Sequence, residues 1–302
     1  MRKANSGSKT PSGRRWLLSG AVAIAAAGAA GAAQFGGWGP AMNAERLPRS
    51  SSQLNTSAND GCPILDPGTN DLYMASNRPG GAGGLDIWIA HWNGAGWDTP
   101  VNAGVGVNTR ADEFCPDPAP GRRLFFVRRL TRTNTDIYVT SRRATGGFTT
   151  AQALARSSSG INSAAEEWSP SFFTAGGTQF LYFSSTREGR QRVYYSVNFG
   201  PASLAPGGVN SSAADARPNV RQDGLEIVWD STRFGTLGGP DIWTASRSSI
   251  NDPWGTAVHL ENGINSAAGE SRASLSNDGH RLMFGTTRAG GEGSSDIWTA
   301  TR

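Results

Sequence analysis

The stretch Asp241-Ile242-Trp243-Thr244-Ala245-Ser246-Arg247 decides the fold, because close copies of it recur along the chain. The copies are Asp86-Ile87-Trp88-Ile89-Ala90, Asp136-Ile137-Tyr138-Val139-Thr140-Ser141-Arg142 and Asp296-Ile297-Trp298-Thr299-Ala300-Thr301-Arg302. Each copy alternates apolar and polar residues with a period of two, which is typical of a strand with one packed face. A unit that recurs about every fifty residues indicates a repeat architecture.

A short motif marks the start of each repeat. It has an Asn, then Ser or Thr, and an acid five residues after the Asn, and four copies have Pro three residues after that acid. The motif occurs five times, at 55–60, 108–113, 162–167, 210–215 and 265–270. Each repeat then contains four strand-like pieces, which is the content of one propeller blade. The sequence therefore predicts an all-β fold, a five-bladed β-propeller of four-stranded blades.

The last repeat ends after its third strand, at Arg302. The segment 47–55 resembles 154–162, which follows the fourth strand of an earlier repeat. Residues 42–48 are therefore predicted to supply the missing fourth strand and to close the ring, because an open ring would leave unpaired strand edges. A linear solenoid is the alternative, but it does not require a blade divided between the two ends of the chain.

The repeat pattern resembles the WD40-like repeats of TolB-type β-propellers. The resemblance rests on acid-x-x-Pro, an apolar run ending in Ser-x-Arg-x-Gly-Gly, and Asp-Ile-Trp-x-Ala-x-Arg, and it extends over nearly the whole chain after the leader. It implies a binding scaffold in the periplasm or at the cell surface. The sequence departs from TolB in having no room for an N-terminal α/β domain and five blades rather than six, so the resemblance does not imply a role in the Tol system.

The first 33 residues have the composition of an export signal. They hold five of the 28 basic residues and none of the 24 acidic ones, so the remaining chain is nearly neutral and has no charge pattern typical of nucleic-acid binding. The pair Arg14-Arg15 precedes an Ala-rich apolar run, a pattern that resembles a twin-arginine signal, with an ordinary secretory signal as the alternative. We expect 1–33 to be the signal, 34–41 a short linker and 42–302 the propeller, exported to the periplasm or the extracellular space without a permanent membrane anchor.

The five repeat acids are the candidate site residues. They begin the first strand of each blade, and that strand lines the central channel of a propeller, so they could form an acidic ring; they are Asp60, Glu113, Glu167, Asp215 and Glu270. The functional interpretation is a cation site or a carboxylate pair for sugar chemistry. The structural interpretation pairs each acid with a repeat Arg or with backbone N–H groups. We favour the structural one, since catalysis needs asymmetry and every blade has the acid. No cofactor is predicted; calcium is conceivable but has no further support.

Three further features allow two readings each. Arg78 and Asp86 are eight residues apart, a spacing repeated in two other blades, and could face each other across a hairpin. The third blade breaks this pattern with Arg192 where Asp is expected, either as a functional patch or as drift compensated by Glu188.

Cys62 and Cys115 lie two residues after the acids of adjacent blades, so a disulfide is possible if the inner strands are close enough. The three His residues have no metal spacing.

Two functional hypotheses follow. The leading one is an exported, non-catalytic binding scaffold for a protein or glycan partner at the cell envelope, acting as a monomer. The alternative is a carbohydrate-active enzyme, a glycoside hydrolase or lyase, that uses carboxylates lining the channel. Acids that are each held by an Arg would favour the first, and unpaired acids at an open cleft would favour the second.

Overall fold

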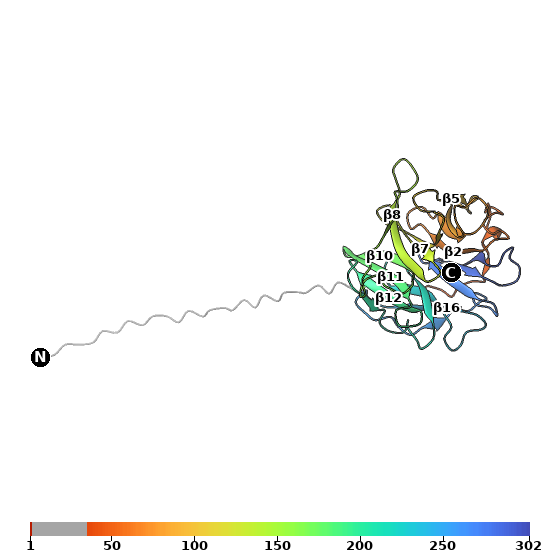
Figure 1. Cartoon of the computed structure of the whole chain (residues 1–302). Coiled ribbons are helices and arrows are strands. Elements are labelled where there is room, and N and C mark those ends of the chain that lie inside the picture. The colour runs from red at the N-terminus through yellow and green to blue at the C-terminus, as the bar shows by residue number, and fades with distance from the viewer. Residues whose placement is uncertain (2–34) are drawn as a thin grey trace. The chain divides into compact units, whose positions relative to one another are not determined.

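The computed structural model describes Met1 and residues 35–302, so the predicted signal at 1–33 falls almost wholly outside the described residues. Residues 42–302 form five antiparallel sheets of four strands each (Figure 1). Within each sheet, successive strands along the chain are neighbours. The inner strands contact one another in the cyclic order β2, β6, β10, β14, β18 and back to β2. The chain therefore folds as the five-bladed β-propeller that the repeats predict.

The blades differ mainly in strand length. Blade 1 has β2 (Asp60–Leu65), β3 (Leu72–Ser76), β4 (Asp86–Ala90) and β5 (Val101–Asn102). Blade 2 has β6 (Asp112–Ala119), β7 (Arg123–Thr131), β8 (Asn134–Ser141) and β9 (Gln152–Ala153). Blade 3 has β10 (Glu167–Ala175), β11 (Thr178–Ser185), β12 (Arg192–Val197) and β13 (Ala202–Leu204). Blade 4 has β14 (Asp215–Val220), β15 (Glu226–Ser231), β16 (Asp241–Ser246) and β17 (Val258–His259).

Blade 5 closes the ring in the way the sequence predicts. It contains β18 (Glu270–Leu275), β19 (Arg281–Thr286) and β20 (Asp296–Thr301), and its outer strand is β1 (Met42–Asn43) from the start of the propeller. β1 pairs antiparallel with β20, with Met42 opposite Thr299. A single 3-10 turn, η1 (Ala44–Arg46), leads out of β1. Within the described residues, no helix is long and apolar enough to cross a membrane.

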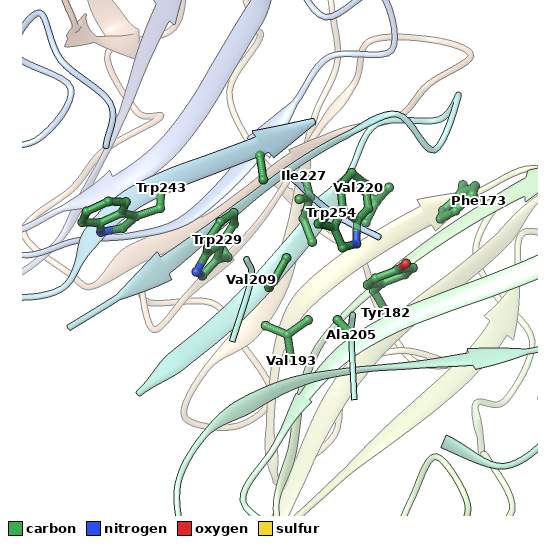
Figure 2. Close-up of a cluster of buried hydrophobic side chains, with 11 residues drawn as sticks. Phe173, Tyr182, Val193, Ala205, Val209, Val220, Ile227, Trp229, Trp243 and Trp254 are labelled. Carbon is green, nitrogen blue, oxygen red and sulfur yellow. The ribbon is translucent and has the colours of Figure 1, made fainter. Parts of the chain in front are cut away.

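The hydrophobic core lies between neighbouring blades. Figure 2 shows one such cluster, in which Phe173 and Tyr182 of blade 3 face Val220, Ile227 and Trp229 of blade 4. The other four junctions have equivalent clusters. Aromatic side chains dominate because each blade presents a flat apolar face to the next, and a fully buried ring removes a large apolar area from water. Neighbouring blades are therefore held together by apolar packing of their faces rather than by strand pairing between blades.

The motif Asn connects each blade to the one before it by two hydrogen bonds. The Asn108 side chain accepts from the backbone N–H of Ile87 at 2.9 Å and donates to the Ile87 carbonyl at 2.9 Å. Asn162, Asn210, Asn265 and Asn55 repeat this arrangement with the third strand of the preceding blade. The amide group thus satisfies the outward N–H and C=O of a strand, as another strand would.

Candidate functional site

The five repeat acids are buried at the start of the inner strands, and each has its own cation. Their exposed fraction is 0% in every blade. The ion pairs are Asp60–Arg78 at 2.6 Å, Glu113–Arg128 at 2.7 Å, Glu167–Arg187 at 3.3 Å, Asp215–Arg233 at 2.6 Å and Glu270–Arg288 at 3.1 Å. None of the five lines the channel cavity. This geometry is the one expected of structural residues, because a buried carboxylate with a partner in every blade is not available to a ligand.

Each acid also organises the turn that precedes it. Glu167 accepts hydrogen bonds from the backbone N–H of Ser163 at 3.0 Å, from its hydroxyl at 2.5 Å and from Ser185 at 2.9 Å. Burial raises the pKa of Glu167, and the hydrogen bonds from Ser163 and Ser185 and the charge of Arg187 oppose that rise. The pKa of Glu113 is raised for the same reason. The carboxylates therefore depend on their donors to remain ionised inside the blade.

The repeat Arg does not pair with the Asp of the third strand, so that part of the sequence analysis is wrong. Arg78 donates to Asp60 and to the carbonyls of Gln53 and Leu54, whereas Asp86 accepts from backbone N–H groups of its own loop, at Ala82 and Gly83. In blade 3, Arg192 pairs with Glu188 at 2.8 Å, which is the compensation proposed for the missing Asp. Both arrangements fix the loop between the second and third strands.

The residue two positions after each repeat acid lines the central channel. At this position every inner strand has a bulge with a left-handed residue, φ between 47° and 58°, and the register of its pairing shifts. We call these five residues the channel ring: Cys62, Cys115, Ser169, Arg217 and Arg272. Cys62 and Cys115 form a disulfide across the junction of blades 1 and 2, with their Cα atoms 4.8 Å apart. The ring surrounds a cavity of about 30 Å³.

A second ring of polar contacts joins the inner strands four residues after each acid. Asp117 accepts from Phe172 N–H at 2.7 Å, Ser171 from Val220 N–H at 2.9 Å and Asn219 from Leu275 N–H at 2.9 Å, while Ser274 donates to the Pro63 carbonyl at 2.7 Å. Blade 1 has the apolar Ile64 at this position. Within the described residues, the junction that lacks this particular contact, between blades 1 and 2, is therefore the one that the disulfide bridges.

The channel mouth, where the inner strands begin, is asymmetric. The residue before the repeat acid is Asp112 in blade 2 and Glu166 in blade 3, whereas the other blades have Asn59, Ala214 and Gly269. We call Asp112 and Glu166 the mouth carboxylates. Sequence analysis did not single them out, although the five-repeat alignment contains the signal, namely acids at one position in two adjacent blades only.

The surroundings of the mouth carboxylates differ. Asp112 accepts from Arg129 at 3.2 Å and from the backbone N–H of Leu85 at 3.1 Å, and 30% of its side chain is exposed. Glu166 is partly exposed, and within residues 35–302 its carboxylate has no hydrogen-bond or ion-pair partner. Glu166 directly precedes β10, and Trp168 is the second residue of that strand. The mouth thus has one anchored and one free carboxylate.

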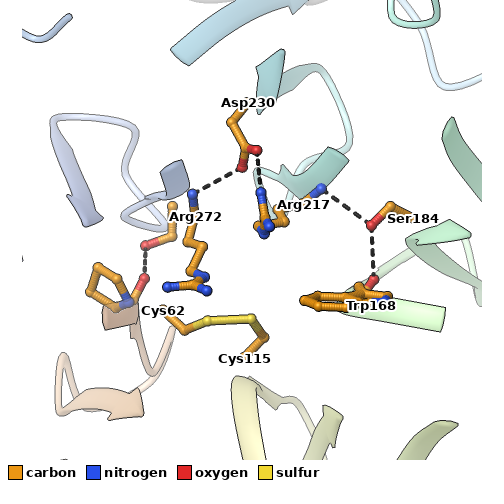
Figure 3. The surroundings of a disulfide bond; sticks show 9 residues. Cys62, Cys115, Trp168, Ser184, Arg217, Asp230 and Arg272 are labelled. Atoms are coloured by element: carbon orange, nitrogen blue, oxygen red, sulfur yellow. Dashed lines mark hydrogen bonds and ion pairs between the residues drawn. A yellow bond between two sulfur atoms is a disulfide. The ribbon is translucent and has the colours of Figure 1, made fainter. Parts of the chain in front are cut away.

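Trp168 connects the two sides of the mouth. Its ring packs edge-to-face on Phe114 at 5.4 Å between centroids. The guanidinium of Arg129, the partner of Asp112, lies 5.3 Å from the same ring, and that of Arg217 lies 5.6 Å from it. Figure 3 shows Trp168 beside the disulfide and Arg217. An aromatic ring flanked by carboxylates and guanidinium groups offers both stacking and hydrogen bonds to a polar ligand. Within the described residues, no three His, Cys, Asp or Glu side chains gather as a metal site.

Solved structures share this fold. A thermostable family-43 glycoside hydrolase matches with a TM-score of 0.56 at 16% identity, covering 83% of this chain and 91% of that one. A family-43 endo-arabinanase from Bacillus licheniformis matches with a TM-score of 0.54 at 14% identity, covering 83% and 94%. A putative TolB from Agrobacterium tumefaciens matches with a TM-score of 0.50 at 16% identity, covering 78% and 72%. No family model matches the sequence. No curated protein matches it either.

These findings correct the leading functional hypothesis. A non-catalytic binding scaffold was expected from the even repeats, but the two structures reported above with the higher TM-scores, 0.56 and 0.54, are glycoside hydrolases, the class named in the alternative hypothesis. The expected TolB-type kinship is supported at the level of the propeller fold. The identities are low, so the likeness establishes the fold alone.

Proposed function

We propose that this protein is a carbohydrate-active enzyme that hydrolyses glycosidic bonds at the channel mouth. The observation that carries the proposal is the pair of mouth carboxylates, Asp112 at the start of β6 and Glu166 directly before β10, at a position that is not acidic in the other blades. Glycoside hydrolysis uses two carboxyl groups in different environments, one on each side of the scissile bond. The fold shared with family-43 glycoside hydrolases supports the same reading.

The two carboxylates suit different roles. Glu166 is partly exposed and has no partner in the described residues, so it can exchange a proton with solvent and deliver it to the departing glycosidic oxygen. Asp112 is held in one orientation by Arg129 and Leu85, so it can accept a proton from the water that attacks the anomeric carbon. Trp168 supplies a surface on which a sugar ring stacks.

The experiment is an activity assay of the full chain on aryl α-L-arabinofuranosides, aryl β-D-xylosides and the corresponding oligosaccharides. Asp112→Asn and Glu166→Gln should each lower kcat by about 10²- to 10⁴-fold, the usual contribution of an acid or base. Asn59→Ala, at the equivalent position of blade 1, is the matched control and should leave kcat unchanged. Full activity in both carboxylate variants, or no turnover of any substrate by the parent protein, would contradict the proposal.

We also propose that the enzyme acts outside the cytoplasm. The basic pair and apolar run of residues 14–33 support export, and the Cys62–Cys115 disulfide suits an oxidising compartment. A polysaccharide substrate at or beyond the envelope is consistent with that location. We retain the WD40-like repeat relationship as a proposal that rests on the repeat pattern. Fractionation of cells that produce the full chain, with and without Arg14→Lys and Arg15→Lys, tests the export route.

A further inference from the structure

The channel ring carries one positive charge that nothing in the described residues neutralises. Arg217 donates to Asp230 at 2.6 Å, and Arg129 donates to Asp112 at 3.2 Å. The side chain of Arg272 makes no hydrogen bond or ion pair within residues 35–302, and its Nε is buried without a partner. Only the backbone N–H of Arg272 reaches Asp230, at 3.0 Å. Asp230 therefore pairs with the guanidinium of Arg217 and accepts only from the backbone of Arg272, so within residues 35–302 the Arg272 guanidinium has no carboxylate partner.

A guanidinium left in this state is costly. The pKa of Arg272 is lowered to about 10, chiefly by burial, with the charges of Arg217 and Arg129 adding to the decrease and Asp230 opposing it. The residue is half-buried and its Nε is fully buried, so the cation gives up part of its solvation without a hydrogen-bonded anion to compensate for it. An anion in the cavity would remove that cost, because guanidinium groups bind carboxylates and other small anions strongly.

The cavity beside Arg272 has further donors that lack partners. The hydroxyl of Ser169, which lines the cavity, is buried without a hydrogen bond, and so is the Nε of Arg217. Figure 3 shows the Arg272 guanidinium beside the Cys62–Cys115 disulfide, and Arg217 in contact with Asp230. A volume of about 30 Å³ exceeds what one water needs, and it accommodates an anion of the size of chloride or formate.

We propose that the central channel binds one small monovalent anion, with Arg272 as its principal ligand and Arg217 and Ser169 as additional donors. The anion is either a free ion or the carboxylate of an acidic molecule, since both present the same charge to the ring. This site is separate from the mouth carboxylates and does not depend on glycosidase activity.

The test is thermal unfolding of the full chain in HEPES, whose anion is too large for the cavity. Sodium chloride, formate or glucuronate is then added at constant ionic strength. We expect at least one small anion to raise Tm by several degrees and to saturate. A response to chloride and formate alike would identify a free-ion site, and a response to formate and glucuronate without chloride would identify a carboxylate site. Equal Tm in all salts would overturn the proposal.

Variants of the channel ring test whether the rise in Tm comes from an anion bound at this site. Arg272→Met should raise Tm in HEPES alone, because an unpaired buried cation is removed, and should weaken anion binding by roughly 10- to 100-fold. Arg132→Met, an exposed Arg in the hairpin of blade 2, is the matched control and should keep the full response. Should Arg272→Met not fold, Ser169→Ala provides the second variant and should weaken binding while leaving the fold intact. An unchanged response in Ser169→Ala or in a folded Arg272→Met would overturn the assignment.

Discussion

Asn55 and Ile297 lie 242 residues apart in the chain and are joined by two hydrogen bonds at the seam of the ring. The Asn55 side chain accepts from Ile297 N–H at 2.7 Å and donates to the Ile297 carbonyl at 3.2 Å. The same side chain also donates to Asn43 in β1 at 3.1 Å. One buried amide thus connects the first blade, the last blade and the closing strand, so the seam repeats the contacts of the other junctions.

Replacing Asn55 should open the seam. Asn55→Ala leaves the N–H and the C=O of Ile297 without partners in a buried position, which costs about 2 to 4 kcal/mol of unfolding free energy. Chemical denaturation measures this loss. Asn251→Ala, at an exposed Asn of blade 4, should change the free energy by no more than about 0.5 kcal/mol. An equal effect of the two substitutions would show that the seam does not depend on the amide.

Glu167 should matter for stability rather than for catalysis. Glu167→Ala removes the partner of Arg187, whose side chain is only 14% exposed, and should destabilise the protein by about 3 kcal/mol. Glu188→Ala, in the same blade, removes a surface pair and should cost less than about 1 kcal/mol. Differential scanning calorimetry compares the two. A stable Glu167→Ala protein that has lost all activity would instead make Glu167 catalytic.

The disulfide should stabilise the junction between blades 1 and 2, where Ile64 replaces the polar residue that contacts the next inner strand in the other blades. Cys62 and Cys115 are separated by 53 residues, and closing a loop of that length restricts the unfolded chain by about 4 kcal/mol. The double substitution Cys62→Ser and Cys115→Ser should lower the unfolding free energy toward that amount and speed hydrogen exchange in β2 and β6 first. A reductant should destabilise the parent protein but not the double variant. Uniform exchange across all blades would argue against a local role.

Trp168 should affect substrate binding more than turnover. Trp168→Ala removes a stacking surface at the mouth and should raise KM roughly tenfold, with a smaller change in kcat. Phe234→Ala is a suitable control, because Phe234 is a fully exposed aromatic on blade 4 that has no contact with the mouth. Steady-state kinetics on the best substrate separates the two parameters. An equal rise in KM for both variants would place the sugar elsewhere.

The repeats were sufficient to predict the blades and the seam. The Asn motif and the Asp-Ile-Trp strand recur because every blade needs the same bonds to its neighbour, so their spacing predicts five blades. The likeness of 47–55 to 154–162 assigns residues 42–48 to the last blade, and the strand found there is β1, Met42–Asn43. The pairing of Arg78 with Asp86 was wrong because sequence spacing does not show that Arg78 reaches back to Asp60 and the turn before it.

The site could be predicted less well, because it depends on positions where the repeats differ. The disulfide remained open at the sequence level, since the distance between inner strands is set by their bulges, which bring the Cα atoms of Cys62 and Cys115 to 4.8 Å. Asp112, Glu166 and Arg272 lie beside residues that recur in all blades. The repeat pattern highlights the recurring acids and does not distinguish these three neighbours. In a repeat protein, the asymmetric positions carry the information on function.

Asp117 should make stability depend on pH. It is 1% exposed, within residues 35–302 its carboxylate accepts a hydrogen bond only from the N–H of Phe172, and burial raises its pKa well above the usual 3.8. The folded state therefore binds this proton more tightly than the unfolded state. The stabilisation is complete below about pH 3.8 and is lost as the pH rises through the folded pKa. Asp117→Asn keeps the acceptor oxygen without the charge, so it should be more stable than the parent at pH 7.

The difference in stability between the parent and Asp117→Asn isolates the contribution of Asp117. Glu113 and Glu167, whose raised pKa values act with the same sign, are present in both proteins. Denaturation of both proteins from pH 4 to pH 8 should give a stability difference that grows with pH. Only the parent has a carboxyl group at position 117, and as the pH rises its folded state must either hold that proton against solvent or bury a charge. Asp98→Asn, at an exposed carboxylate of blade 1, should follow the parent throughout. A difference between Asp117→Asn and the parent that stays constant with pH would mean that Asp117 has the same proton affinity in the folded and unfolded chain.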